Sequence, residues 1–462
     1  MDIKKQMLDE LNRKEIFNQA RDYAFEYIDK INDCDVYPSR ENLEELKVLK
    51  EDLQNESFSA SKILSLLHEI GTLGTVAHTG GRYFGFIIGG ATPISLATKW
   101  LTDIWDQCGG LYVSSPINAE LEVICEKWIK DLLKLPKETV AGFVSGASMA
   151  NFSAIIAARY HILKNLGWDV NKKGLNGAPK VRIVTHQQIH ASIRKNLVLA
   201  GFGDENIEYV PSDEQGKLIV NELPELDKSC IVFLQAGNAN SGSFDDFDTI
   251  CTIANKANAW THIDGAFGLW AATSKELSYL TKGIEKADSW VLDAHKTLNV
   301  PYDSGIVLCK HANSLANALQ ANGEYIIYSK GKRDPMLYTP EMSKRSRAFE
   351  LWATLKYLGK NGIDEMIFTF HQQSKRLATE LKNIGFTILN EVVFNQILVY
   401  LDNDSKTNAV LEYLQNSKEL WLGGSTWNGS SVIRISISSW RTDESDISRT
   451  VELFKKAKEA CA

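Results

Sequence analysis

Short apolar runs rich in β-branched residues alternate with helix-patterned segments through the middle of this 462-residue chain. The apolar runs lie at residues 181–185, 230–236, 259–264, 289–294 and 305–309, and helical stretches such as 247–258 separate them. A helix between two strands carries the chain back across one face of a sheet, so the two strands can pair in parallel. The alternation therefore predicts an α/β domain with a mostly parallel sheet that is covered on both faces.

The two ends of the chain follow other patterns. The first part is helix-patterned with charged faces, and the last part combines a long helical stretch, two apolar strands and a closing helix. We therefore expect a helical N-terminal segment at 1–90, a large domain at 91–360 and a smaller C-terminal α+β domain at 361–462. No low-complexity linker marks either boundary.

Composition and charge exclude several classes of partner and site. The net charge is -7 and no block of Lys and Arg occurs, which argues against a nucleic acid or an anionic membrane surface as a partner. The seven cysteines are scattered and form no CxxC pair, so we expect a reducing compartment and no structural metal. Residues 1–17 lack the apolar core of a signal peptide, and the uncharged run 139–158 is too polar for a membrane span. The expected location is the cytoplasm.

Two reactive side chains stand at the ends of expected strands. Lys296 follows the run 289–294, and because lysine is almost never buried unless it is paired, an exposed surface lysine is the plainer interpretation of this residue alone. Asp264 ends the run 259–264 and is followed by Gly265 and Ala266, which leave room for a flat ligand. An aspartate that makes a turn is the alternative at this position.

Two further segments carry binding chemistry. Small residues at 145–148 run into a helix, where backbone N–H groups and the helix dipole favour an anion such as phosphate, although a plain helix cap is the alternative. Neither a dinucleotide fingerprint nor a P-loop sequence is present. His186 and His190 are four residues apart, but with no HExxH pattern and no third ligand we expect no metal site.

Together, these segments supply what pyridoxal 5′-phosphate requires of a protein. That cofactor needs a lysine for its Schiff base, an anion beside its pyridinium nitrogen and a site for its phosphate. Lys296, Asp264 and the segment 145–148 meet these needs, and His190 could stack on the ring. The sequence therefore predicts a pyridoxal phosphate enzyme.

The chain resembles the group II pyridoxal-phosphate-dependent amino-acid decarboxylases, the family of aromatic-L-amino-acid and glutamate decarboxylases. The resemblance covers nearly the whole chain, and its most specific motif is DAHKTLNVPYDSG at 293–305. Less specific motifs are GGRYFGFIIGGATP, SSPINAELE, SGASMAN, HIDGAFG, DPMLYTPEMSKRSRAF and LGGSTWNGSSVIRISISSWRTDESDI. It implies the type I, aspartate-aminotransferase-like fold with a mostly parallel seven-stranded sheet, and the conversion of an amino acid to its amine and CO₂.

The resemblance also implies roles for individual residues. Lys296 would be the Schiff-base lysine and Asp264 the partner of the pyridine nitrogen, while His190 and Ala266 would pack on opposite faces of the ring. The phosphate would be held by Ala147, Ser148 and His295.

Two segments depart from the family pattern. Where many members carry threonine near the phenolic oxygen of the cofactor, this chain has AGNANSG, which offers the amide of Asn238 or Asn240. The family also has a mobile loop whose tyrosine protonates the substrate carbon after CO₂ leaves. Tyr325, Tyr328 and Tyr338 are the candidates here, and Tyr338 is our choice.

The family's substrate pocket maps to Phe84 and Phe86, which favours an aromatic or other apolar amino acid. Glutamate, aspartate and small aliphatic amino acids remain open. A partner subunit's loop around residues 108–111 would complete the pocket, so an obligate homodimer with shared active sites is implied. The alternatives are an aminotransferase in which Arg434 binds a substrate carboxylate, an oxygen-consuming enzyme that forms an aldehyde, and a non-catalytic binding protein.

Overall fold

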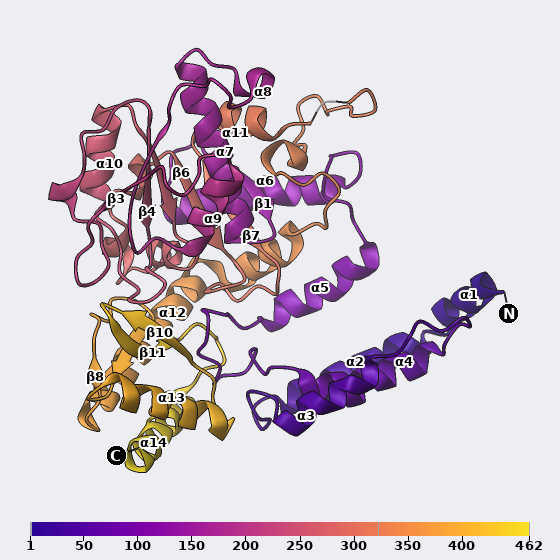
Figure 1. The fold of residues 1–462 in the computed structure, drawn as a ribbon. Coiled ribbons are helices and arrows are strands. Elements are labelled where there is room, and N and C mark those ends of the chain that lie inside the picture. Colours follow the sequence, from indigo (N-terminus) through magenta and orange to yellow (C-terminus); the bar gives the residue numbers. More distant parts are fainter. Residues whose placement is uncertain (1, 322, 462) are drawn as a thin grey trace.

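A seven-stranded sheet forms the centre of the computed structural model, which describes residues 2–321 and 323–461 (Figure 1). The strand order is β1-β7-β6-β5-β4-β2-β3. The strands are β1 (Val140–Val144), β2 (Arg182–His186), β3 (Ile207–Val210), β4 (Cys230–Gln235), β5 (Trp260–Asp264), β6 (Ser289–Asp293) and β7 (Gly305–Cys309). Strands β2 to β6 pair in parallel, and β7 runs antiparallel to both of its neighbours, β1 and β6. The carboxyl ends of β1 to β6 therefore share one edge with the start of β7.

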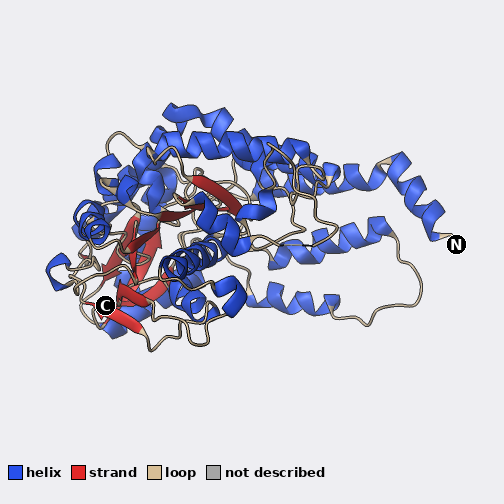
Figure 2. Cartoon of the chain, turned by 90° about the horizontal axis from the view of Figure 1, so that it is seen from above, coloured by secondary structure: helices blue, strands red, loops and turns tan. Residues whose placement is uncertain are grey.

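Helices cover both faces of this sheet, as Figure 2 shows with strands enclosed among helices. Alternate residues of one strand reveal the two faces, because successive side chains of a strand point to opposite sides. Val291 packs with residues of α7, whereas Trp290 and Leu292 belong to the larger cluster that includes α6 and α10. The helices are α5 (Pro93–Trp105), α6 (Pro116–Leu133), α7 (Ala147–Asn165), α8 (Val170–Lys173), α9 (Ala191–Leu199), α10 (Phe247–Lys256) and α11 (Ala312–Leu319).

Large aromatic side chains fill the layer between the sheet and its helices. Trp270 and Trp290 are fully buried, and each such side chain contributes on the order of 1.5–3 kcal/mol through removal of apolar surface from water. Their indole N–H groups remain paired, because Trp290 donates to the carbonyl of Ile284 at 2.8 Å and Trp270 to that of Asp293 at 2.9 Å. The second of these bonds fixes the carboxyl end of β6.

The C-terminal region forms a separate, four-stranded antiparallel sheet with strand order β10-β11-β9-β8. Its strands are β8 (Thr387–Ile388), β9 (Gln396–Tyr400), β10 (Gly423–Trp427) and β11 (Ser430–Ser436), and its helices are α12 (Ala348–Asn383), α13 (Asp404–Ser417) and α14 (Glu444–Ala460). Helix α12 crosses the expected domain boundary at residue 360, and its helical geometry breaks at Gly359, where φ is 58°. The division into three parts stays a prediction.

The first helices project away from the rest of the chain (Figures 1 and 2). They are α1 (Ile3–Arg13), α2 (Glu15–Lys30), α3 (Arg40–Glu45) and α4 (Ala60–Leu66), and none of them contains a buried residue. Large apolar side chains on them are exposed, among them Met7, Leu11, Phe17 and Phe25. Within 2–321 and 323–461, no helix has both the length and the apolar character needed to cross a membrane.

Candidate active site

A cavity of about 550 Å³ lies at the carboxyl ends of the parallel strands. Chain segments that are far apart in the sequence meet there because the ends of parallel strands share one edge of the sheet. Eight of the residues singled out from the sequence line this cavity, namely Phe86, Ala147, Ser148, His190, Asp264, Ala266, His295 and Lys296. The structure thus brings together most of the side chains that the sequence assigned to one site.

Lys296 lies just beyond the end of β6, where its side chain is largely buried. Its Nζ lies 3.3 Å from Oδ2 of Asp293, the last residue of that strand. A lysine that is withdrawn from water is stable in its charged form only beside such a partner. The surface-lysine interpretation therefore does not describe this residue.

Asp264 ends β5 and is held by hydrogen bonds to both of its carboxylate oxygens. Oδ1 accepts the backbone N–H of Ala266 at 3.1 Å, and Oδ2 accepts Nδ2 of Asn151 at 3.0 Å. Helix α7 contributes Asn151, a residue that the sequence did not single out. Its polar side chain within an otherwise apolar helix face is the signal that could have found it.

A chain of hydrogen bonds continues behind Asn151. Its Oδ1 accepts Nε2 of His262 at 2.9 Å, and Nδ1 of His262 contacts the hydroxyl of Ser289 at 2.8 Å. That hydroxyl accepts the indole N–H of Trp260 at 2.9 Å. Burial lowers the pKa of His262 to about 4, so the imidazole is neutral at pH 7 and donates from Nε2 only. This series of hydrogen bonds fixes which end of the Asn151 amide faces Asp264.

His190 precedes α9 and caps its N-terminus. Its Nδ1 accepts the backbone N–H of Ser192 at 3.2 Å and lies 2.8 Å from the hydroxyl of the same residue. Burial lowers the pKa of His190, which keeps the ring neutral. A neutral, capped imidazole at the cavity wall offers a flat face for stacking.

The N-terminus of α7 forms the end of the cavity that could bind an anion. Gly146 is the cap residue and no side chain caps the helix, so the N–H groups of its first turn are free to face a ligand. The start of β7 lies very close by, because a Cβ added to Gly305 would lie 2.3 Å from the Cα of Gly146. Glycine at position 305 is therefore what lets the two segments approach.

His295 lies beside this end of the cavity. Its Nδ1 accepts the backbone N–H of Ser304 at 3.1 Å, and its Nε2 lies 3.4 Å from Oδ2 of Asp293. The ring packs against Tyr302 with 4.3 Å between centroids. Burial lowers the pKa of His295, so it contributes an N–H donor and no charge at pH 7.

Arg434 reaches the cavity from β11 of the C-terminal sheet. Its Nη1 donates to the carbonyl of Ala239 at 3.0 Å, the one hydrogen bond of this guanidinium found within the described part of the chain. The rest of the five-donor fork remains available to a ligand. Gln235 and Asp293 also line the cavity, and the sequence had singled out neither.

Three residues assigned to the site from the sequence do not line the cavity. The amide of Asn238 points into its own turn, where it accepts the backbone N–H groups of Asn240 and Ser241 at 2.9 and 3.2 Å. Phe84 is only 1% exposed and packs in the main core cluster. Of the two phenylalanines expected in the substrate pocket, only Phe86 faces the cavity.

Tyr338 is the third of these residues. It ends the short helix η8 (Pro335–Tyr338), and its ring lies 4.6 Å from the guanidinium of Arg333. That guanidinium pairs with Glu122 at 2.9 Å and Glu126 at 2.8 Å, both on α6. The tyrosine thus covers a buried ion cluster, which is why it is not available to this chain's cavity.

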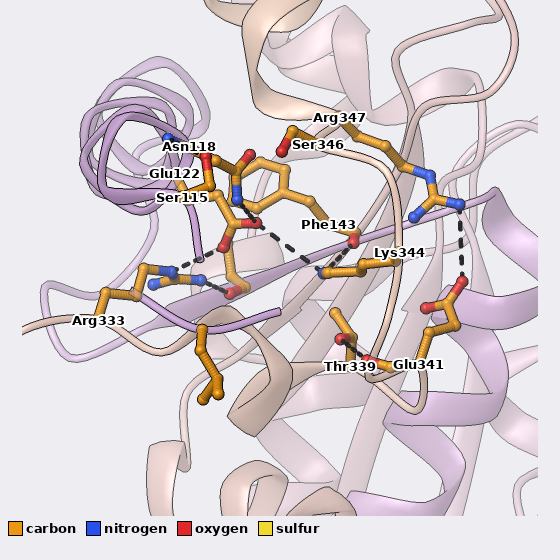
Figure 3. A network of polar contacts seen from close by, with 12 residues as sticks. Ser115, Asn118, Glu122, Phe143, Arg333, Thr339, Glu341, Lys344, Ser346 and Arg347 are labelled. Carbon is orange, nitrogen blue, oxygen red and sulfur yellow. Dashed lines mark hydrogen bonds and ion pairs between the residues drawn. The ribbon is translucent and has the colours of Figure 1, made fainter. Parts of the chain in front are cut away.

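Figure 3 shows that cluster, with Arg333 facing Glu122. Lys344 donates from Nζ to the carbonyl of Phe143 at 2.9 Å, and burial lowers its pKa. Arg333 and Lys344 together fasten the segment 333–347 to α6 and to the strand that leads into Gly146. The segment 108–111 is held by the same region, since Gly109 donates to the carbonyl of Lys344 at 2.8 Å.

The two other candidate tyrosines lie in the loop before this segment. Tyr325 is exposed to solvent, at 81%. The hydroxyl of Tyr328 donates to the carbonyl of Ala321 at 2.7 Å. Neither lines the cavity of its own chain.

Comparison with known protein families identifies the chain. Residues 43–400 match the model of the pyridoxal-dependent decarboxylase conserved domain. The chain belongs to the pyridoxal-dependent decarboxylase family. It is an enzyme, an amino-acid decarboxylase, and its cofactor is pyridoxal 5′-phosphate.

Curated relatives include decarboxylases named for acidic amino acids and decarboxylases named for aromatic ones. The acidic amino acid decarboxylase GADL1 of Mus musculus is 26% identical over 391 residues, which cover 81% of this chain and 69% of the relative. The Xenopus tropicalis protein of the same name is 28% identical, over 67% of this chain and 62% of its own length. An aromatic-L-amino-acid decarboxylase of Bacillus atrophaeus is 26% identical, over 67% of this chain and 65% of the relative.

Solved structures establish the fold of this decarboxylase. The Oryza sativa TDC structure with PLP and tryptamine superposes with a TM-score of 0.91 at 19% identity, over 98% of both chains. Mouse CSAD gives 0.88 at 19% identity, over 97% of this chain and 99% of that one. The type I fold with a mostly parallel seven-stranded sheet, expected from the sequence, is confirmed.

The side chains around the cavity fit pyridoxal phosphate. A paired lysine, a carboxylate held by two donors and an uncapped helix N-terminus correspond to the three needs of that cofactor, and a neutral imidazole offers a flat face to its ring. When bound, the cofactor supplies a ring that accepts the electrons of the broken Cα–carboxylate bond. The protein's part is to hold the ring and the substrate in the orientation that exposes that bond.

Proposed function

We propose that this decarboxylase acts on an L-amino acid whose side chain ends in a carboxylate. The observation that carries the proposal is Arg434, a half-buried arginine that lines the cavity and whose guanidinium makes one hydrogen bond within the described residues. A planar guanidinium binds carboxylates in a bidentate manner, and the low polarity around it strengthens such a pair. Burial lowers the pKa of Arg434, so an anionic ligand would offset the cost of keeping that charge out of water.

We propose roles for the other residues at this cavity on the same basis. Lys296 would carry the cofactor, Asp264 would keep the ring nitrogen protonated, and His190 would stack on the ring opposite Ala266. The phosphate would lie at the start of α7, against the N–H groups of Ala147 and Ser148. Their common position around one cavity supports these assignments.

An aromatic substrate is the second candidate. The phenyl ring of Phe86 is 64% exposed at the cavity, and Phe267 lines it as well. An apolar side chain would gain from contact with these rings. Phe84 no longer supports this candidate, because it lies in the core.

We further propose that two copies of the chain assemble through the projecting N-terminal helices. Exposed apolar side chains continue from these helices onto α5, where Trp100, Leu101, Ile104 and Trp105 are accessible. A monomer rarely exposes so much contiguous apolar surface. In such a dimer the partner's loop could supply the tyrosine that protonates the substrate carbon, and Tyr325 and Tyr328 are the candidates.

A cytoplasmic location is proposed from the thiols. All seven cysteines are free, and four of them, Cys125, Cys230, Cys251 and Cys309, are buried. Free thiols in this number are typical of a reducing compartment.

The test compares substrates on the cofactor-loaded enzyme and on its Arg434→Gln variant. We expect the wild-type chain to release CO₂ from L-aspartate or L-glutamate, and the variant to lose at least about 100-fold in kcat/KM for that substrate, as expected of a buried, charge-assisted pair. Activity on an aromatic amino acid should be far lower and should change little in the variant. Arg449→Gln, which removes an exposed arginine on α14, is the control and should match the wild type.

The outcomes separate the alternatives. An equal loss for every amino acid would assign Arg434 to the α-carboxylate and overturn the proposed specificity. Higher kcat/KM for L-tyrosine or L-tryptophan than for the acidic amino acids would favour the second candidate. A keto acid or an aldehyde as product would indicate the aminotransferase or oxidative alternative.

A further inference from the structure

One carboxylate oxygen at the anion-binding end of the cavity lacks a partner. Asp293 is 2% exposed, and Oδ1 is buried without a hydrogen bond to any residue in the described ranges. Its other oxygen, Oδ2, faces Lys296 at 3.3 Å and His295 at 3.4 Å. A buried, unpaired acceptor is costly, so its presence in a ligand cavity indicates that a ligand provides the missing donor.

The position of Oδ1 shows which part of a ligand it meets. A Cβ added to Gly146 would lie 3.8 Å from this oxygen, and Gly146 is the residue that caps α7. The unpartnered oxygen therefore borders the uncapped helix N-terminus. This is where the phosphate lies in the arrangement proposed above, on which the present inference rests.

A carboxylate and a phosphate are both acceptors, so they repel each other unless a proton lies between them. A phosphate monoester has a second pKa of about 6, and its monoanion keeps one P–O–H group that can donate. The dianion has no such group. Side by side in a site of low polarity, the two acceptors favour the protonated form of the ligand.

We propose that Asp293 makes the site selective for the phosphate monoanion of the cofactor, with the P–O–H group donating its hydrogen bond to Oδ1 of Asp293. No covalent bond changes in this step, and the proton comes from solvent when the free ligand is a dianion. Cofactor binding at neutral and alkaline pH thus takes up one proton. Asp293 acts as a specificity-determining residue for the ionic form of the cofactor.

Other ionisable groups face Asp293 and enter the pH dependence. Lys296 and His295 follow it in the chain, Tyr302 packs on the ring of His295, and His190 approaches from the start of α9. The segments from α7 and β7 contribute Gly146, Ser148 and Gly305, which carry no charge. The Asp293 carboxylate raises the pKa of His295 and of His190, so its removal also changes how these two groups titrate. A ligand without the phosphate measures that change separately.

The test measures the binding of pyridoxamine 5′-phosphate, which cannot condense with Lys296, to the cofactor-free full chain. Calorimetry at about pH 8 in two buffers of different ionisation enthalpy gives the number of protons taken up. We expect the wild type to take up about one proton more than Asp293→Asn, whose amide can donate to the dianion. Between about pH 6.5 and 8.5 the wild-type affinity should fall about tenfold per pH unit relative to the variant.

Pyridoxamine without the phosphate is the matched ligand, and Asp288→Asn is the matched variant. Asp288 precedes β6 at the opposite end of the strand and pairs with His311 at 2.9 Å. Its variant should keep the extra proton uptake of the wild type. With pyridoxamine, the wild type and Asp293→Asn should take up the same number of protons.

Each result decides a different point. Equal proton uptake by the wild type and Asp293→Asn with the phosphorylated ligand would overturn the role of Asp293. Equal affinity of the wild type for pyridoxamine and its phosphate would overturn the phosphate position on which this role rests. Neither result depends on turnover, so both are distinguishable from a failure of the proposed substrate. If Asp293→Asn does not fold, the wild type alone still tests the proposal through the two ligands.

Discussion

The side-chain amide of Asn151 donates a hydrogen bond of 3.0 Å to Oδ2 of Asp264, and its oxygen accepts Nε2 of His262 at 2.9 Å. One amide thus links the carboxylate at the end of β5 to a neutral, fully buried imidazole. Each group donates a hydrogen bond to the next one, from Trp260 through Ser289 and His262 to Asn151 and Asp264. The orientation of the carboxylate is therefore set from behind the cavity before any ligand binds.

Replacing Asn151 with leucine removes the donor to a buried carboxylate oxygen. The unpaired oxygen should reduce the free energy of unfolding by about 1–3 kcal/mol, and cofactor retention should fall. Urea unfolding and the absorbance of bound cofactor after dialysis measure both effects. Asn255→Ala, which removes an exposed amide that donates to the carbonyl of Lys286, should change stability far less. Wild-type stability in Asn151→Leu would contradict the importance of this contact.

His262 should make the fold sensitive to acid. Its pKa is about 4 in the folded chain and about 6.5 when exposed, so the neutral ring contributes stability that is present above pH 6.5 and lost as the pH falls toward 4. The loss from this group should reach about 3 kcal/mol, at 1.36 kcal/mol per pKa unit. Urea unfolding of wild type, His262→Asn and His68→Asn between about pH 7.5 and 4.5 is the measurement. An acid dependence as steep in His262→Asn as in the other two would refute this origin.

Gly305→Ala should damage the end of the cavity at which we propose that the phosphate binds. The added Cβ would lie 2.3 Å from the Cα of Gly146, which is a backbone contact and cannot be relieved by a side-chain movement. The start of α7 must shift, so we expect at least about a tenfold loss in affinity for pyridoxal phosphate, or roughly 1.4 kcal/mol. Gly423→Ala is the control, because its Cβ would have no neighbour within 4 Å. Unchanged affinity in Gly305→Ala would mean that the close approach does not shape the proposed phosphate site.

Arg333→Met should destabilise the chain strongly. It leaves Glu122 buried with its closest cation gone, and breaking one partner of such a pair costs about 3–5 kcal/mol. Chemical denaturation measures the loss, and the double variant Glu122→Gln with Arg333→Met should recover part of it. Equal stability of the single and double variants would show that the uncompensated charge is not the cause.

Much of the fold follows from local sequence patterns. The five apolar runs expected as strands are β2 and β4 to β7, because each is long enough for its composition to show. Strand β3 escaped because it has four residues at the sheet edge, with only Ile207 and Val210 buried. Strand β1 was not predicted because it and the start of α7 lie in one continuous uncharged run, 139–158, in which no change of pattern separates strand from helix.

The lining of the cavity was predictable where chemistry and chain order coincide, as for Lys296 and Asp264, which both line it. The lining was less predictable where the direction of a side chain decides whether the residue reaches the cavity. Phe84 and Phe86 are the same residue type and lie two positions apart. Nevertheless, Phe84 faces the core and Phe86 faces the cavity. Tyr338 was chosen among three tyrosines of one segment that the family resemblance did not tell apart. Its ring lies against Arg333, which pairs with Glu122 of α6, and no local pattern shows that contact.

Asp293 shows a different limit. An aspartate at the end of an apolar strand is common in ordinary turns. Only the missing hydrogen-bond partner of Oδ1 among the described residues distinguishes Asp293 as a binding residue. Such an absence is a property of three-dimensional packing. No sequence pattern records it.

The measurement that tests the account most directly is product identification by mass spectrometry. The cofactor-loaded protein and its Lys296→Ala variant would each receive L-aspartate, L-glutamate and a panel of other L-amino acids. We predict that the wild type forms the matching amine with one CO₂ per amine, most rapidly from an acidic amino acid, and that Lys296→Ala forms none over many turnovers. A keto acid or an aldehyde from the wild type, or sustained amine production by Lys296→Ala, would contradict the account.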